Sequence, residues 1–348
     1  MADNQEQKPE VGQDNKTDAP SGRTAKTEKS EPSSTRAENP LAGVTALLER
    51  YGYQLGDILG KGSYAVVRKA YSRRHKRYVA VKIICKKKAP EDFLSKFLPR
   101  EIKVLKKLHH PHVLSLIEVI ETNTRMYIIT DLAESGDLLE FIRKNGAVAE
   151  AQAKRLFKQL VLGITYVHSQ DVVHRDLKCE NLLLDKEKNL VVSDFGFARD
   201  NLTSATGKKK LCHTYCGSYA YAPPEILKGE LIPQIFSLGF TIHQAILMVP
   251  LGIAYDATLA DVWSMGVILY TMVCGRLPFD DSNLRSLLQQ VHRRVNFPSK
   301  IKIAEPVKAI IHKMLQWNLT ERVTVEQLRT DPWLTEEKIE NEVEIASS

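Results

Sequence analysis

The spacing of apolar residues divides this chain into two parts of different secondary structure. Up to about Leu132, five short runs have the alternation or the β-branched content of strands, and one helical segment interrupts them. In that segment Ile102, Leu105 and Leu108 recur at helical spacing. Beyond Leu132 the helical patterns prevail. This order predicts an α+β fold, with a small β-rich lobe that holds one helix and a larger helical lobe.

Three segments of the second part have patterns that indicate their surroundings. Residues 151–170 place their apolar side chains on one stripe, which predicts an amphipathic helix. Residues 261–274 have little polar surface, which predicts a buried helix. Two apolar runs, residues 182–184 and 190–192, enclose a polar turn and predict a hairpin. That hairpin would carry Asp194 to a cleft between the lobes.

Polar residues near this hairpin have the types and the spacing that phosphoryl transfer requires. Within residues 174–181, Asp176 can accept the proton of an attacking hydroxyl, and Lys178 offers a point charge for a migrating phosphate. Asn181 and Asp194 offer the hard oxygen atoms that Mg²⁺ prefers. The reaction needs positioned charge more than covalent chemistry by the protein. These residues therefore indicate a site that transfers a phosphate group.

A glycine-containing loop upstream is the candidate cover for the nucleotide phosphates. Gly60 and Gly62 follow a strand-like run, and small residues let a hairpin lie close over phosphates, with backbone N–H groups facing them. Ala65 stands where the usual pattern has its third glycine. Considered alone, the loop has the alternative interpretation of a plain hairpin turn.

A lysine on the next strand is the candidate ligand of the α- and β-phosphates. Lys82 lies among β-branched neighbours on the apolar run 78–85, so its amine should be held at a defined depth. Its predicted partner is Glu101 on the following helix, and Glu91 is a poorer candidate because it precedes the periodic run. The alternative for Glu101 is a solvated helix carboxylate.

Taken together, these motifs resemble those of a eukaryotic protein kinase, from about Tyr51 to Leu334. The likeness is closest to the testis-specific serine kinase family, within the calcium/calmodulin-dependent-kinase-like group. Residues 63–65, 96–102, 172–179 and 273–283 carry this finer resemblance. It implies a two-lobed kinase fold, protein substrates with Ser or Thr acceptors, and a role in spermatogenesis.

The resemblance also implies roles for individual residues. Asp176 would be the catalytic base, Lys82 and Lys178 would bind phosphates, and Glu101 would pair with Lys82. Asn181 and Asp194 would hold Mg²⁺. Thr130 would be the gatekeeper beside adenine, and Ser218 would support a Ser/Thr substrate. The residues expected to contact ATP are Leu59, Gly60, Lys61, Gly62, Ser63, Val67, Ala80, Lys82, Thr130, Asp131, Ala133 and Asp137.

Regulation by phosphorylation is expected at a loop threonine. Arg175 directly precedes the catalytic aspartate and needs an anion. A phosphate on Thr214 would carry roughly −1.5 to −2 charges and order the loop, so we expect an upstream activating kinase. The run 208–210, three lysines, is interpreted as a solvated basic face, with attraction of an acidic partner as the alternative.

An apolar segment, residues 230–252, is absent from the usual family pattern. In the family Glu225 would pair with Arg322, and Asp261 would hold the catalytic loop. Here residues 226–260 separate Glu225 from Asp261, and residues 230–252 form an apparent insert of 23 residues. No Asp, Glu, Lys or Arg occurs between residues 231 and 254. The interpretations are a membrane span, a surface flap or docking helix, or an alternative-exon product that damages folding. The last would make the chain an inactive scaffold.

Composition and charge fit one catalytic unit with tails. The chain has 348 residues, of which 43% are hydrophobic, enough for a sizeable core. Residues 1–46 are polar and should be disordered, and residues 335–348 form a C-terminal tail. Residues 1–46 carry a net charge of −2, which leaves +9 on the rest of a chain whose formal net charge is +7. Basic runs at residues 73–77 and 86–88 lack a nucleic-acid recognition motif, so a nucleotide and acidic partners explain them more simply.

Cysteine usage and the N-terminus bear on the cellular location. The five cysteines form no Cys-x-x-Cys pair, which argues against a disulfide framework or a zinc site. We expect reduced thiols, with a redox switch between Cys212 and Cys216 as the alternative. The N-terminus has no apolar signal core. The expected location is the cytoplasm or the nucleus, with neither a membrane nor a specific nucleic acid as partner.

Overall fold

The computed structural model describes residues 40–200, 202–203, 211–212, 217–227 and 255–336. The chain divides into two compact units, Met1–Val44 and Thr45–Ser348, and the larger one contains the strands, the later helices and the site. Helix α1 (Pro40–Arg50) begins inside the stretch that was expected to be disordered through residue 46, so that prediction was wrong for residues 40–46. The apolar segment 230–252, Thr214 and residues 337–348 lie outside the described residues.

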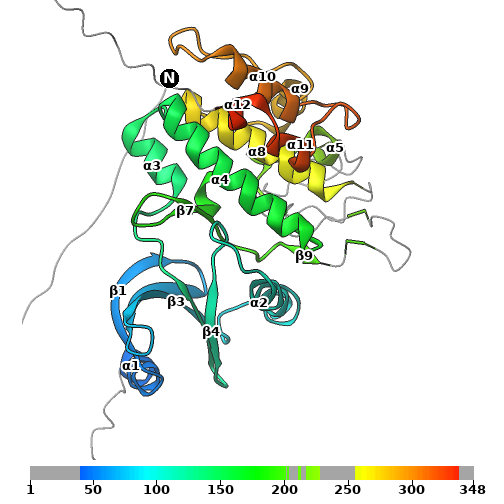
Figure 1. The fold of residues 1–348 in the computed structure, drawn as a ribbon. Coiled ribbons are helices and arrows are strands. Elements are labelled where there is room, and N and C mark those ends of the chain that lie inside the picture. The colour runs from blue at the N-terminus through cyan, green and yellow to red at the C-terminus, as the bar shows by residue number, and fades with distance from the viewer. Residues whose placement is uncertain (1–39, 201, 204–210, 213–216, 228–254, 337–348) are drawn as a thin grey trace, which may run out of the picture. The chain divides into compact units, whose positions relative to one another are not determined.

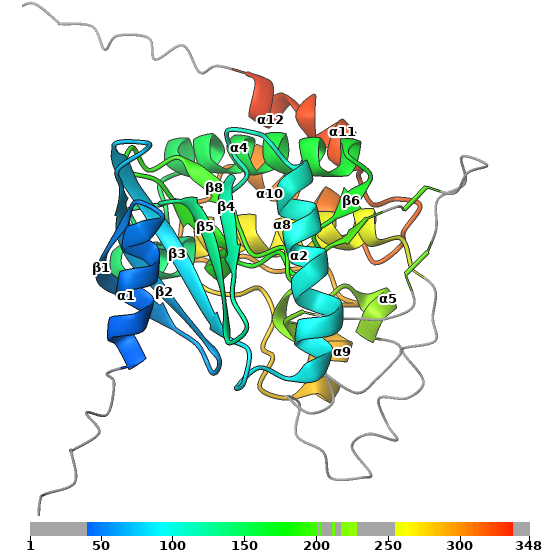
Figure 2. The same cartoon turned by 90° about the horizontal axis from the view of Figure 1, so that it is seen from below.

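A five-stranded antiparallel sheet forms the N-terminal lobe of the larger unit. Its strands run in the order β1-β2-β3-β5-β4, as Figures 1 and 2 show. The register pairs Val67 with Lys82 and Ala80 with Thr130. These pairs bring the predicted nucleotide contacts of three strands side by side. The strand bounds are Tyr53–Lys61 (β1), Ala65–Ser72 (β2), Arg77–Cys85 (β3), Leu116–Glu121 (β4) and Arg125–Asp131 (β5).

One long helix interrupts the strands, as the sequence predicted. Helix α2 (Leu98–Lys107) follows a π-helical turn, Phe93–Phe97, and its second residue is Pro99, where the missing N–H costs no intrahelical hydrogen bond. Both views place α2 beside strand β4 (Figures 1 and 2). The helix buries Leu98, Glu101, Val104 and Leu105. A glutamate therefore shares the apolar face of the helix and needs a partner inside the protein.

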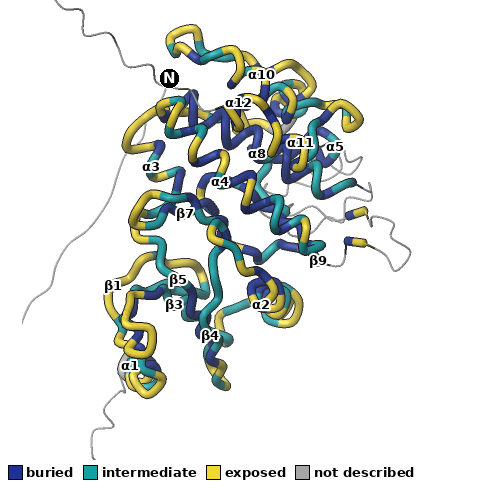
Figure 3. The backbone as a smooth tube through the Cα atoms, viewed as in Figure 1, coloured by how far each residue is buried: buried dark blue, intermediate teal, exposed yellow. Residues whose placement is uncertain are grey.

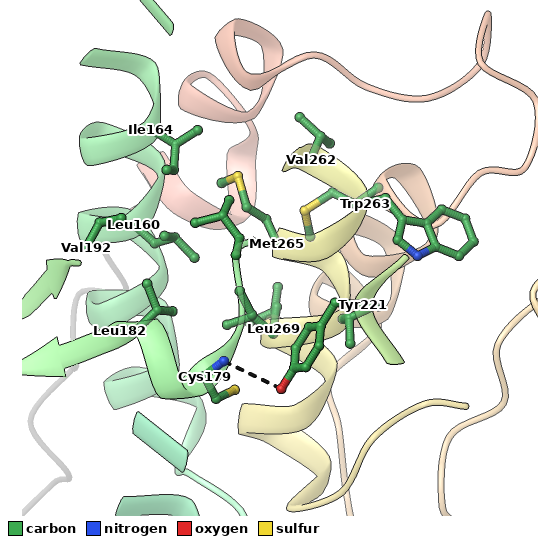
Figure 4. Packing of buried hydrophobic residues seen from close by; sticks show 14 of the residues in the cluster. Leu160, Ile164, Cys179, Leu182, Val192, Tyr221, Val262, Trp263, Met265 and Leu269 are labelled. Atoms are coloured by element: carbon green, nitrogen blue, oxygen red, sulfur yellow. Dashed lines mark hydrogen bonds between the residues drawn. The ribbon is translucent and has the colours of Figure 1, made fainter. Parts of the chain in front are cut away.

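The C-terminal lobe is helical and is organised around α4 (Glu150–Ser169) and α8 (Ala257–Cys274). Helix α8 is buried over nearly its whole length, as Figure 3 shows. The side chain of Asp256 caps its first turn, and Gly275 ends it in the left-handed conformation, with φ of 69°. Figure 4 shows apolar side chains of α8 meeting those of α4 and of the hairpin β7–β8. This core includes Leu177 and Cys179, which belong to residues 174–181, the catalytic loop.

Short elements connect the two main helices. The predicted hairpin is confirmed, because β7 (Leu182–Leu184) pairs with β8 (Leu190–Val192). A second short pair joins β6 (Val172–Val173) to β9 (Arg199–Asp200). The remaining elements are α3 (Leu138–Asn145), two 3₁₀ turns (Cys179–Asn181 and Tyr219–Tyr221), α5 (Pro224–Leu227), α9 (Leu284–Gln290), α10 (Glu305–Met314), α11 (Val325–Arg329) and α12 (Pro332–Thr335).

Helix α8 is also the one described helix that is long and apolar enough to cross a bilayer. However, 83% of that 18-residue window is buried inside the protein. Because a core helix of a folded domain has the same composition, burial accounts for its apolar character. The four cysteines in the described part, Cys85, Cys179, Cys212 and Cys274, are free thiols.

Candidate active site

A cavity of about 760 Å³ lies between the sheet and the helical lobe. This volume is within the range of small-molecule sites in proteins. Strands β1, β2, β3 and β5, helix α2 and the segment that follows β5 supply its walls, and β7 supplies Leu183. Most of the residues that were expected to contact the nucleotide line it: Leu59, Gly60, Val67, Ala80, Lys82, Thr130, Asp131, Ala133 and Asp137, together with Glu101 and Asp194.

Three predicted contacts lie outside this lining. Lys61 is the exposed last residue of β1, and Gly62 and Ser63 lie in the exposed turn between β1 and β2. The N–H of Gly62 donates to the carbonyl oxygen of Ala65, at 2.8 Å, which closes the turn. Their role as phosphate contacts stays a prediction. Asp137 lines the cavity, but its side chain also accepts a hydrogen bond from the backbone of Glu140, at 2.8 Å, and caps α3.

The predicted lysine–glutamate pair is present in the cavity wall. Lys82 Nζ lies 2.7 Å from Glu101 Oε1. Burial lowers the pKa of Lys82, but the carboxylates of Glu101 and Asp194 raise it by more, so its pKa is above the ordinary value. The amine is therefore charged and held at a fixed position. The alternative of a solvated Glu101 is wrong, because that residue is only 4% exposed.

The catalytic loop brings Asp176, Lys178 and Asn181 together. Lys178 Nζ lies 3.0 Å from Asp176 Oδ2. Asn181 Nδ2 donates to the same Oδ2, at 3.0 Å, and to the carbonyl oxygen of Asp176, at 2.8 Å. The other carboxylate oxygen, Oδ1, is buried and has no hydrogen-bond partner among the described residues. A buried carboxyl oxygen without a donor is suited to accept a proton from a substrate hydroxyl.

A buried aspartate on α8 holds the backbone of this loop. Asp261 Oδ2 accepts from the N–H of His174, at 3.0 Å, and Oδ1 accepts from the N–H of Arg175, at 2.9 Å. His168 Nε2 lies 2.9 Å from Asp261 Oδ2. Burial raises the pKa of Asp261, but its contacts with His168 and the loop lower it by more, so the carboxylate stays ionised. Arg175 takes a φ of 69°, a strained conformation that these hydrogen bonds stabilise.

Asp194 reaches the cavity because the next residue is anchored in the core. Phe195 is fully buried, and its ring centroid lies 4.9 Å from that of His174. Asp194 has a φ of 61°, which turns the chain sharply, and its Oδ1 accepts from the N–H of Gly196 at 3.4 Å. The carboxylate thus faces the same space as Lys82. Asn181 lies near this segment, because its backbone carbonyl oxygen accepts from the N–H of Ser193 at 2.9 Å. That Asp194 and Asn181 together hold a divalent cation stays a prediction.

The family assignment rests on a match that covers most of the chain. A family model described as "Protein kinase domain" matches residues 53–334. The chain belongs to the protein kinase family. Protein kinases transfer a phosphate group from ATP with the help of a divalent cation, and the cavity, Lys82, Asp176 and Asp194 fit that chemistry.

Curated relatives of this kinase include several with similar names. Testis-specific serine/threonine-protein kinase 1 of Mus musculus is 46% identical over 291 residues, which cover 83% of this chain and 73% of that protein. Testis-specific serine/threonine-protein kinase 4 of Homo sapiens is 43% identical over 300 residues, which cover 83% and 84%. Testis-specific serine/threonine-protein kinase 3 of Mus musculus is 38% identical over 284 residues, which cover 81% and 96%.

A buried ion pair joins helix α5 of this kinase to the segment that precedes helix α11. Arg322 binds Glu225 through two hydrogen bonds, Nη1 to Oε1 at 2.7 Å and Nη2 to Oε2 at 2.9 Å. Its guanidinium also lies 5.0 Å from the ring centroid of Trp263. This pair and the Asp261 contacts both form, although residues 228–254 separate the segments that they join. The described structure therefore gives no support to the hypothesis that the apolar segment disrupts these supports.

The sequence interpretation missed several residues of the site. Lys69, Leu105, Leu114, Ile128 and Leu183 line the cavity and were not predicted. Residues 182–184 are all leucine, so no pattern distinguished Leu183, which is half-buried between the buried Leu182 and Leu184. Ser218, which was predicted beside the acceptor, lines a small cavity together with Asp176. Cys212 is buried, while its proposed redox partner Cys216 lies outside the described residues.

Proposed function

We propose that this chain is a serine/threonine protein kinase of the testis-specific type that uses Mg²⁺-ATP and acts in spermatogenesis. The observation that carries the catalytic part is the loop geometry around Asp176, whose buried Oδ1 has no hydrogen-bond partner among the described residues while Lys178 and Asn181 hold Oδ2. The names of the relatives, all testis-specific serine/threonine-protein kinases, support the tissue and the acceptor class.

The residues of the site divide the work of transfer between them. Bound ATP with its cation supplies the phosphoryl group and neutralises part of its charge. Lys82, which belongs to the N-terminal lobe and is held by Glu101, binds phosphate oxygens. Asp194 and Asn181 offer oxygens to Mg²⁺. Asp176 orients the acceptor hydroxyl and takes its proton. Lys178 lies beside that carboxylate, where its charge can stabilise the transferring group.

We further propose a cytoplasmic or nuclear location for this kinase, and an upstream kinase as its activator. Arg175 directly precedes the catalytic base, and a phosphorylated Thr214 would supply the anion for it. Neither a membrane nor a nucleic acid is needed for this chemistry. Thr214→Ala tests the activation step, because undiminished phosphate transfer by that variant would contradict it.

The decisive experiment compares Asp176→Asn with wild type in phosphate transfer to a generic basic protein, with Mg²⁺-ATP. Removal of a general base costs about 10²- to 10⁴-fold in rate, so we expect activity at or near background. Glu180→Gln is the matched control, because Glu180 is an exposed carboxylate of the same loop. Full activity in Asp176→Asn would refute the assignment.

A further inference from the structure

Helix α2 and the turn before it contact the C-terminal lobe through three side chains. The contacts are of three kinds, one aromatic, one ionic and one from an amine to a backbone carbonyl. They join Phe97 to Phe197, Lys103 to Asp200, and Lys107 to Gln170. We call Phe97, Lys103 and Lys107 the α2 brace.

The ionic contact of the brace joins α2 to strand β9. Lys103 Nζ lies 2.5 Å from Asp200 Oδ2. The hydrogen bond from Lys103 lowers the pKa of Asp200, so the carboxylate is ionised. Asp200 pairs in turn with Val172 of β6, two residues before His174. A charge on α2 is thus tied to the strand that leads into the catalytic loop.

The two other contacts reach the same region of the C-terminal lobe. The ring centroids of Phe97 and Phe197 lie 5.9 Å apart with their planes at 76°, an edge-to-face pair. Phe197 is three residues after Asp194. Lys107 Nζ donates to the carbonyl oxygen of Gln170, directly after α4. All three contacts therefore meet segments that adjoin Asp194 or the catalytic loop.

The contacts of the α2 brace and the pairing with Lys82 use different residues of the helix. Lys103 and Lys107 are four residues apart and lie on one face of α2, while Glu101 is buried and meets Lys82 at 2.7 Å. Since a helix moves as a rigid element, a contact that sets its rotation also sets the position of Glu101.

We infer that the α2 brace positions Glu101 for its pair with Lys82, with Lys103–Asp200 as the charge-dependent element. The inference rests on the proposed kinase function, because the Lys82–Glu101 pair matters through the phosphates that Lys82 binds. Lys103 is a positioning residue, since its contacts are with Asp200 and not with the nucleotide cavity. The brace supplies order to α2 from within the chain, whatever the state of Thr214.

The expected effect is moderate for loss of the charge and larger for its reversal. The side chain of Lys103 is 65% exposed, although that of Asp200 is only 16% exposed. Exposed ion pairs contribute little, so Lys103→Gln should lower kcat/KM for ATP about threefold. Lys103→Glu places two like charges together and should lower it about tenfold or more.

A charge exchange tests the pair directly. We would measure kcat/KM for ATP in the full chain for Lys103→Glu, Asp200→Lys and the double variant. The single reversals should each lose about tenfold, and the double variant should recover to within about threefold of wild type. The matched control is Lys96→Glu with Asp92→Lys, an exposed pair 2.7 Å apart within the segment before α2. We expect no change in kcat/KM for that control.

Hydrogen exchange provides a readout that is independent of activity. Without nucleotide, amides of residues 98–107 should exchange faster in Lys103→Glu than in wild type, while those of β5 should not, which also shows that the fold is intact. In the charge-exchanged double variant, the amides of residues 98–107 should exchange as slowly as in wild type, which would support the inference. If Lys103→Glu destabilises the whole fold, Lys103→Gln provides the same comparison with a smaller perturbation.

Two results would overturn the brace and leave the kinase assignment standing. One is wild-type kcat/KM and wild-type exchange of residues 98–107 in both Lys103 variants, while Asp176→Asn is inactive. The other is a double variant that is as impaired as the single reversals, since this would mean that the charges do not act on each other. Activity in Asp176→Asn would instead refute the proposed function.

Discussion

Removing the carboxylate of Glu225 should cost this kinase a large part of its stability. In Glu225→Ala the guanidinium of Arg322, whose side chain has no exposed area, would lose the partner that binds it at 2.7 and 2.9 Å. Among the described residues it would keep the carbonyl oxygens of Gln316 and Leu259 and the ring of Trp263. Breaking a buried ion pair by removing one partner costs about 3–5 kcal/mol.

This loss is large compared with the free energy of unfolding of a typical domain, about 5–15 kcal/mol. For a domain of this size, each kcal/mol lowers the melting temperature by about 2–4 °C, so we expect a fall of roughly 6–20 °C. The assay is urea and thermal unfolding followed by tryptophan fluorescence, because all three tryptophans belong to the C-terminal lobe. Replacing both partners, in Glu225→Leu with Arg322→Met, should cost less than Glu225→Ala alone, because no charge stays buried. A fall of under about 3 °C in Glu225→Ala would refute the reasoning.

Two further predictions concern packing and pH. Gly163→Ala should lower the free energy of unfolding by about 1–3 kcal/mol, because the added Cβ would lie 2.9 Å from the carbonyl oxygen of His112. Leu162→Ala, at a partly exposed neighbour, is the control. An unchanged urea midpoint in Gly163→Ala would count against the close packing. Burial raises the pKa of the Cys274 thiol from 9.0 to about 11, so the stability that its neutral form contributes should be complete below pH 9 and lost as the pH rises through about 11. Between pH 8 and pH 11.5 wild type should therefore lose more stability than Cys274→Ala, and parallel curves would contradict this.

The sequence predicted those elements that are specified by neighbouring residues. The hairpin at residues 182–184 and 190–192 was predicted at its observed bounds, because two apolar runs around a polar turn are a pattern of neighbouring residues. Helix α8 begins four residues earlier than expected, since Asp256 caps it through its side chain, a signal that the apolar pattern does not contain. Helix α1 was not predicted, because its first residues belong to an N-terminal stretch that is polar as a whole.

Candidate site residues were recognisable because phosphoryl transfer needs few residue types in a known order. Asp176, Asn181 and Asp194 follow one another within 19 positions, and Lys82 precedes them on a strand. The apolar lining of the cavity, such as Leu114 and Leu183, was not recognisable, because the sequence pattern does not separate an apolar residue of a cavity wall from one of the core.

The sequence alone determined the kinase family, the two-lobed order of elements and the chemical types at the site, since these follow from short-range patterns and motif spacing. Only the tertiary structure decided which carboxylates are buried, as Glu101 and Asp261 are, and which charges meet across the fold, as Lys103 with Asp200 and Glu225 with Arg322 do. The two residues of each ion pair are 97 positions apart in the sequence, so no local pattern indicates that they interact. Their pairing depends on where packing of the whole core places each helix, and burial then sets how strongly each pair interacts.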